Sequence, residues 1–339
     1  MIRMQRLGFL FFALVFCGWL GANGSEHAAP PKDTLPTTLS LKDIPLGLDA
    51  NRCVPKDNPL TEAKVRLGRR LFFDPILSAD GAVSCASCHD PAHGLAGQAR
   101  LAVGIKGKQM HRNAPSLWNR AYGTSFFWDG RESSLEGQAL RPIESSSEMG
   151  GTIEGAVERL RAQKEYTVLF EAAFGEGATA NNLSKSLASF ERVLLSGNSR
   201  VDRFRAGQVR GLSDSERHGL WLYESRGGCW RCHAGPNFSD ESFHNTGVSW
   251  SEPPIDLGRF AVTNKDSDRG RFKTPTLRNV ALTAPYMHDG SLATLEDVVD
   301  FYNRGGGKKS HLDASIAPLG LSAEEKKDLV AFLKALSGE

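Results

Sequence analysis

Two short stretches decide the architecture of this chain: CASCH at residues 85–89 and CWRCH at residues 229–233. Each has the pattern C-x-x-C-H, the spacing of a covalent c-type haem site. In such a site two thioethers hold the porphyrin and the histidine reaches the iron. Zinc would need two further soft ligands at tetrahedral spacing, and none follows either motif. The sequence therefore predicts two haem c groups, held by Cys85, Cys88 and His89 and by Cys229, Cys232 and His233.

The two motifs lie 144 residues apart, and helical periodicity surrounds each of them. A helix is expected from Ala63 to Phe73, and capping patterns at 213–216 and 322–325 predict two more. Strand alternation is scarce. We therefore expect a mostly α fold with two cytochrome c-like helical domains, at 45–198 and 199–339, each binding one haem. The last helix is expected to pack in its own domain or on the N-terminal one.

Overall composition and the N-terminal segments give further expectations. Of 339 residues, 40% are hydrophobic and 24% charged, as in ordinary globular proteins, and the formal charge of +2 leaves little for nucleic-acid binding. Residues 1–24 have the pattern of a cleaved signal peptide: Arg3, Arg6, a short apolar run and a small-residue end. That run is too short to span a bilayer, so export without stable membrane insertion is expected. Residues 25–44 resemble a flexible tether. Cys53 has no evident disulfide partner and is expected to be a buried or free thiol.

From about residue 58 to the end, the sequence resembles the bacterial di-haem cytochrome c peroxidase / MauG family. The matching tracts, besides the two motifs, are LGRRLFFD at 67–74, RNAP at 112–115, FWDGR at 127–131, EMG at 148–150, GRF at 258–260, TLRNV at 276–280 and HDG at 288–290. The resemblance implies that peroxide reacts at the first haem and that the second haem transfers electrons. It places a bridging tryptophan at Trp128, a distal glutamine at Gln138 and a catalytic glutamate at Glu148.

Two positions distinguish this chain from many peroxidases of that family. The tract that often carries a distal histidine reads Val-Gly-Ile at 103–105, and Ile105 cannot ligate iron, so the first haem is expected to be five-coordinate. His111 or His93 could ligate in its place. At the second haem the alignment puts Tyr302, as in MauG, where other members have methionine.

The ligand of the second haem has open alternatives. A helix with Leu295, Val298, Val299 and Tyr302 on one face, closed by glycines 305–307, would direct Tyr302 to the second haem. Otherwise Tyr302 is a core residue and Met287 or Met149 is the ligand. The resemblance also implies a calcium ion at Asn113, Thr283 and Pro285, since hard cations take oxygen ligands.

Three functions compete. The first is a periplasmic enzyme that reduces hydrogen peroxide with electrons from a small cytochrome c or a cupredoxin. The second is a MauG-like oxidase of Trp or Tyr residues in a partner protein. The third is a di-haem electron carrier or sensor without turnover, which would be expected to close both irons with axial ligands. We interpret the chain as a peroxide-dependent di-haem oxidoreductase, with a homodimer among the expected assemblies.

Overall fold

The computed structural model describes Met1 and residues 32–248, 255–307 and 310–338, so the expected signal peptide lies almost wholly outside the described residues. Its α-helices are α1 (Glu62–Phe73), α2 (Leu135–Glu144), α3 (Ile153–Arg161), α4 (Lys164–Phe174), α5 (Ala180–Glu191), α6 (Arg200–Arg205), α7 (Asp214–Glu224), α8 (Phe260–Thr263), α9 (Leu295–Asn303) and α10 (Ala323–Lys334). Short 3-10 helices include η2 (Cys85–Ser87), η5 (Arg120–Tyr122), η6 (Cys229–Arg231) and η9 (Val280–Leu282). Strands β1 (Phe243–His244) and β2 (Phe272–Lys273) form an antiparallel pair. The predicted mostly α class is confirmed.

The helices that the sequence predicted begin and end where their capping residues stand. Helix α1 starts after Thr61, whose hydroxyl accepts a hydrogen bond from a backbone N–H of the first turn, and it ends at Asp74. The expected capping boxes at Ser213 and Ser322 are both present, at the starts of α7 and α10. A hydroxyl at this position satisfies backbone donors that a helix start leaves unpaired, which fixes the boundary locally.

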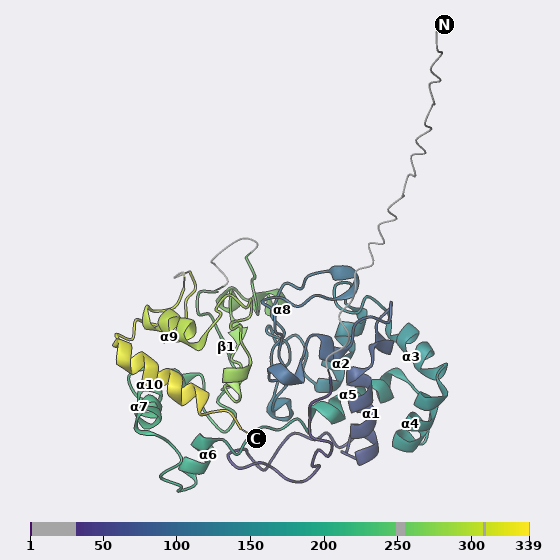
Figure 1. Cartoon of the computed structure of the whole chain (residues 1–339), viewed down its shortest axis with the longest axis horizontal. Coiled ribbons are helices and arrows are strands. Elements are labelled where there is room, and N and C mark those ends of the chain that lie inside the picture. Colours follow the sequence, from purple (N-terminus) through teal and green to yellow (C-terminus); the bar gives the residue numbers. More distant parts are fainter. Residues whose placement is uncertain (2–31, 249–254, 308–309, 339) are drawn as a thin grey trace.

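The apolar core is divided between the two halves of the chain. The largest cluster of buried residues draws its members from Val201 to Leu336, whereas two further clusters draw theirs from Leu35 to Leu194. In Figure 1 helices α1 to α5 accordingly lie on one side of the molecule, and α6, α7, α9 and α10 lie on the other. Each C-x-x-C-H motif therefore has a hydrophobic core of its own.

The same helix crossing organises both halves. Helix α1 packs on α5, and α7 packs on α10. A Cβ added at Gly68 of α1 would lie 2.0 Å from the Ser186 carbonyl oxygen, and one added at Gly219 of α7 would lie 2.0 Å from the Asp328 carbonyl oxygen. Only glycine allows two helix backbones to approach this closely.

The last helix, α10, packs mainly on α7 and α9, within its own half of the chain. The alternative of packing on the N-terminal domain is therefore not what the structure has, because Leu329, Phe332 and Leu336 complete the C-terminal apolar cluster. The chain that follows α10 does reach the boundary between the halves, where a Cβ on Gly338 would meet Gly197.

No helix in the described part of the chain combines the length and the apolar character that crossing a membrane requires.

Candidate active site

The two C-x-x-C-H motifs fold alike. In each, a 3-10 turn begins at the first cysteine, and the histidine backbone N–H donates to that cysteine's carbonyl oxygen, at 3.0 Å for His89 and 2.9 Å for His233. The ring Nδ1 of His89 lies 3.2 Å from the Leu95 carbonyl oxygen, and that of His233 lies 3.0 Å from the Phe238 carbonyl oxygen. Because a carbonyl can only accept, Nδ1 carries the proton and Nε2 keeps its lone pair for a metal.

The surroundings of the motifs also fit haem. Both lie on the wall of one cavity of about 1230 Å³. The four cysteines and two histidines of the motifs line this cavity, whereas the residues between the cysteines do not. Burial raises the pKa of the Cys85 and Cys229 thiols to about 12, so both are protonated at neutral pH. Pairs of buried, protonated thiols beside a buried imidazole match the donor set of two covalent haem groups.

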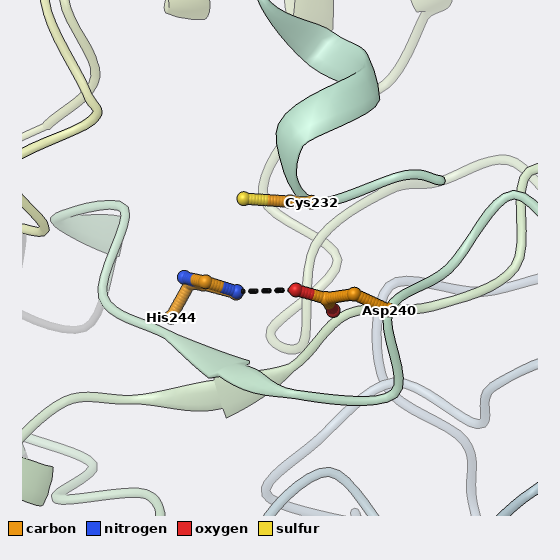
Figure 2. A group of neighbouring side chains, drawn as sticks. All are labelled: Cys232, Asp240 and His244. Carbon is orange, nitrogen blue, oxygen red and sulfur yellow. Dashed lines mark hydrogen bonds and ion pairs between the residues drawn. The ribbon is translucent and has the colours of Figure 1, made fainter. Parts of the chain in front are cut away.

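A cluster beside the second motif has the residue types of a metal site but serves the motif instead. Figure 2 shows Cys232, Asp240 and His244 facing one another, with the His244 Nε2 hydrogen-bonded to Asp240 at 2.9 Å. Its Nδ1 lies 2.8 Å from an Asp313 oxygen. The Cys232 sulfur, and then Asp313 and Asp240, raise the pKa of His244 to about 10. Once Cys232 is a thioether it no longer offers a thiolate, and His244 keeps its two carboxylate partners, Asp240 and Asp313.

The segments that follow the motifs repeat at a spacing of 160 residues. Asn119 and Asn279 both adopt positive φ, as do Gly130 and Gly290. The bridge between Phe126 and Glu132 has its counterpart between Tyr286 and Leu292, and α2 and α9 begin 160 residues apart. In this register Tyr302 of α9 is equivalent to Pro142 of α2, and both line the cavity. Proline has no side-chain atom that can bind iron.

Gln138 and Glu148 also line the cavity, on the same half as Pro142. Gln138 lies on α2, and Glu148 lies in the loop after it, where its carbonyl oxygen accepts from the Ile105 N–H at 2.8 Å. Burial raises the pKa of the Glu148 carboxyl, against the opposing effects of Arg131 and Ser145. The structure thus brings together, in the first half, a carboxyl of raised pKa, an amide and a position without a ligand atom.

Trp128 lies where the two halves meet. Its indole N–H donates to the Asn113 carbonyl oxygen at 2.8 Å, while its own carbonyl oxygen accepts from the Lys273 N–H of the other half at 2.8 Å. Its ring meets His288 edge to face, with centroids 6.5 Å apart. His288 is stacked on Phe272, and burial lowers its pKa to about 4. The cavity wall therefore carries an aromatic group between the two motifs.

Tyr302 faces the second motif. Burial, and then the Cys229 and Cys232 sulfurs, raise the pKa of its phenol, while a hydrogen bond with Thr246 lowers it. Helix α9 and the positive-φ glycines after it follow the sequence prediction, and Leu295, Val298 and Tyr302 line the cavity. Both alternative ligands, Met287 and Met149, line the cavity too.

Met149 lines the cavity as well, but it belongs to the N-terminal apolar cluster that packs against Cys85 of the first motif, not to the second half. The two alternative histidines near the first motif differ as well. His93 does not line the cavity and faces Asp90, with Nδ1 3.1 Å from a carboxylate oxygen, whereas His111 is exposed at the cavity wall. Ile105 lines no part of the cavity and is buried.

The three residues expected at a calcium ion all line the cavity near the junction of the halves. Asn113 is buried, and its side-chain N–H groups donate to the Ala99 and Arg100 carbonyl oxygens at 3.1 and 3.2 Å, while its side-chain oxygen accepts no hydrogen bond within the described part of the chain. Thr283 and Pro285 follow η9. Elsewhere, Cys53 is exposed and forms no disulfide with any described cysteine, so of the two expectations for it the structure favours the free thiol over the buried one.

Sequence reasoning missed two features. Pro142 would have been found by aligning the two halves at the 160-residue spacing. Glu191, a buried carboxyl on the cavity wall, would have been found by aligning α5 with α10.

Comparison with known proteins agrees with this geometry. The family model "Di-haem cytochrome c peroxidase" matches residues 62–210. The chain is 43% identical over 287 residues to the methylamine utilization protein MauG of Methylorubrum extorquens, covering 84% of this chain and 81% of that protein. It is 37% identical to the cytochrome-c peroxidase IdrP1 of a Pseudomonas strain, covering 91% and 88%. A solved MauG-like protein associated with microbial copper homeostasis has a TM-score of 0.79 at 34% identity, covering 90% of this chain and 96% of that one.

Two C-x-x-C-H motifs that fold alike, a buried glutamate on the shared cavity wall and these relatives lead to one conclusion: the chain belongs to the di-haem cytochrome c peroxidase and MauG family of haem c enzymes.

Proposed function

We propose that this protein reduces hydrogen peroxide at the first haem, with electrons that a small redox protein delivers through the second. The observation that carries the proposal is the difference between equivalent positions of the two halves. Tyr302 offers the second half a phenol oxygen that could bind iron, whereas Pro142 offers the first half no ligand atom. An open iron position beside Glu148 and Gln138 suits a small substrate, while a pure electron carrier needs no such opening.

The bound haem supplies the redox-active iron, and the chain manages the protons. Reducing hydrogen peroxide to two water molecules consumes two electrons and two protons. Glu148 accepts the proton of the entering peroxide and returns it to the leaving oxygen. Its raised pKa brings it closer to neutral pH, where a group can both take and give a proton. Gln138 orients the peroxide by hydrogen bonding, and Trp128 lies on the electron route between the halves.

Two exposed tryptophans support an electron entry point at the second motif. Trp230 lies within the motif and is 48% exposed, and Trp221 on α7 is 55% exposed. Tryptophan is enriched at protein–protein interfaces, so these two side chains suit contact with a partner protein. A small cytochrome c or a cupredoxin is the donor that such a surface fits.

The second candidate, oxidation of Trp or Tyr residues in a partner protein, is favoured by Tyr302. A phenolate ligand stabilises ferric and more oxidised iron, whereas a thioether raises the potential. The relative named MauG, at 43% identity, also points this way. With a partner protein as reductant, the tryptophan surface would contact the substrate itself.

The proposal also includes the protein's cellular location and a bound calcium ion. The leader pattern at 1–24 supports export to the periplasm, where c-type haem is attached. The free side-chain oxygen of Asn113, with Thr283 and Pro285 nearby, supports one calcium ion between the halves. A homodimer is part of the expected assembly.

Glu148→Gln tests the peroxidase proposal. It keeps the shape of the side chain but removes the proton shuttle, so peroxide-dependent oxidation of a reduced cytochrome c should slow by about 10²-fold or more. Glu144→Gln, at an exposed carboxyl near the end of α2, is the matched control and should leave the rate unchanged. An unchanged rate in Glu148→Gln, with both haems bound, would remove Glu148 from the reaction.

A further inference from the structure

A buried carboxyl stands on the cavity wall without a partner. Glu191 is the last residue of α5, is 6% exposed and lines the cavity. Its Oε2 is buried and has no hydrogen-bond partner in the described part of the chain. Such an arrangement costs stability, since a buried polar atom without a partner loses its hydration. After burial, the negative charge of this carboxyl is the next cause that raises the pKa of the Cys85 thiol. Glu191 therefore lies near the attachment point of the first haem.

The helix crossing does not explain the carboxyl. In the first half Gly68 meets Ser186 and Phe190, and in the second Gly219 meets Asp328 and Phe332. These contacts align the sequence of α5 with that of α10. The residues that directly follow Phe190 and Phe332 are therefore equivalent in the two halves. They are Glu191 in one half and Leu333 in the other. Leu333 lines the cavity as part of an apolar cluster, so leucine satisfies the same place in the same architecture.

The neighbouring charges leave Glu191 unpaired. Arg192 gives both of its terminal nitrogens to Glu136, at 2.6 and 2.9 Å, and Arg120 lies 3.0 Å from Glu241. These two guanidinium groups and the Glu136 carboxylate are the charges that act on Glu191 besides the Cys85 sulfur. Burial raises the pKa of Glu191 to about 8, and the arginines offset only part of that rise. With a pKa of about 8, the Glu191 carboxyl can change its protonation state near neutral pH.

We propose that Glu191 is a proton-binding site coupled to the redox state of the first haem. When the ferric iron takes one electron from the protein donor, the Glu191 carboxylate takes one proton from solvent. When the iron is oxidised again, the proton leaves. The physical cause is electrostatic, because an added electron in a cavity of low dielectric raises the proton affinity of a nearby carboxylate. The coupling goes beyond the proposed reduction of peroxide and involves neither Glu148 nor Gln138.

The test is an equilibrium redox titration of the two-haem protein, without peroxide, between about pH 6 and pH 9. In the wild type the reduction equilibrium constant of the first haem should fall with rising pH, approaching tenfold per pH unit, or about 59 mV for a one-electron couple. In Glu191→Gln that dependence should flatten. The second haem is the internal control, because Leu333 occupies its equivalent position, and its pH dependence should stay the same in both proteins.

Two further measurements keep the test decisive. Glu191→Leu copies the packing of the second half and should give the same flat profile, so it replaces the glutamine variant if that variant fails to load haem. The reduced-minus-oxidised infrared spectrum of the wild type should show a carboxylic acid C=O band that shifts when glutamate carries ¹³C. An unchanged pH profile in either variant, or the absence of that band, would overturn the proposal. A failed Glu148→Gln assay would leave these readouts untouched, so the two proposals fail separately.

Discussion

At the scale of single residues, the two halves of this molecule differ where their chemistry differs. The duplicated segments keep the same backbone, as the positive φ of Asn119 and Asn279 shows. Within that shared backbone Pro142 of the first half is equivalent to Tyr302 of the second, and Glu191 is equivalent to Leu333. The first half thus carries an open distal position and an unpaired carboxyl, and the second half carries a phenol and an apolar contact.

Tyr302→Phe tests the ligand of the second haem. If the Tyr302 phenolate binds the iron, the resting protein should contain one high-spin and one low-spin ferric haem, and the variant should lose the low-spin signal in electron paramagnetic resonance. Tyr302→Met should raise the potential of that haem, because a thioether disfavours the ferric state. Met287→Leu is the matched control and should preserve the signal. A low-spin signal that survives Tyr302→Phe but disappears in Met287→Leu would make Met287 the ligand and favour the plain peroxidase over the MauG-like oxidase.

At the scale of secondary-structure elements, two helix pairs hold the two haem sites. The close approach of α7 to α10 depends on Gly219, and that of α1 to α5 on Gly68. Overpacking a tight contact forces backbones apart, and the apolar faces on both sides of the crossing then lose contact.

Gly219→Ala should lower the free energy of unfolding by about 1–3 kcal/mol, measured by urea denaturation of the haem-loaded protein. Gly177→Ala is the control, because a Cβ there meets nothing within 4 Å and the residue does not have positive φ. That change should leave stability unchanged or raise it by about 0.4–1 kcal/mol, since alanine restricts the unfolded chain. Equal effects of the two substitutions would contradict the role assigned to the helix crossing.

At the scale of the whole molecule, buried ion pairs tie the halves together next to Trp128. The Lys273 ammonium donates to the Ser125 carbonyl oxygen at 2.6 Å and pairs with Glu241, which also binds Arg120. Although burial opposes it, Arg120 and Lys273 hold the pKa of Glu241 below its usual range. Burial lowers the pKa of Lys273 to about 8.

Glu241→Gln should lower the free energy of unfolding by about 3–5 kcal/mol, because it leaves two buried cations without their partner. The wild type should also lose stability as pH falls below about 4.3, because a carboxylate with a lowered folded pKa stabilises the fold only while it is ionised. The variant should lose less over that interval. Calorimetry at several pH values measures both effects. Glu324→Gln, at an exposed carboxyl on α10, should change neither, and an equally large effect there would refute the assignment.

The sequence by itself determined whatever rests on local spacing. The two C-x-x-C-H motifs, the capping boxes at Ser213 and Ser322, and the helix that presents Tyr302 each depend on residues a few positions apart, so each could be read before any folding was considered. Only the tertiary structure decided which side chains are buried and which of them meet. Met149 proved to pack in the first half, His93 proved to face Asp90, and Glu191 proved to be buried without a partner. Burial depends on how separate segments pack together, and the pKa of a buried carboxyl follows from that packing as well as from its neighbours in the chain.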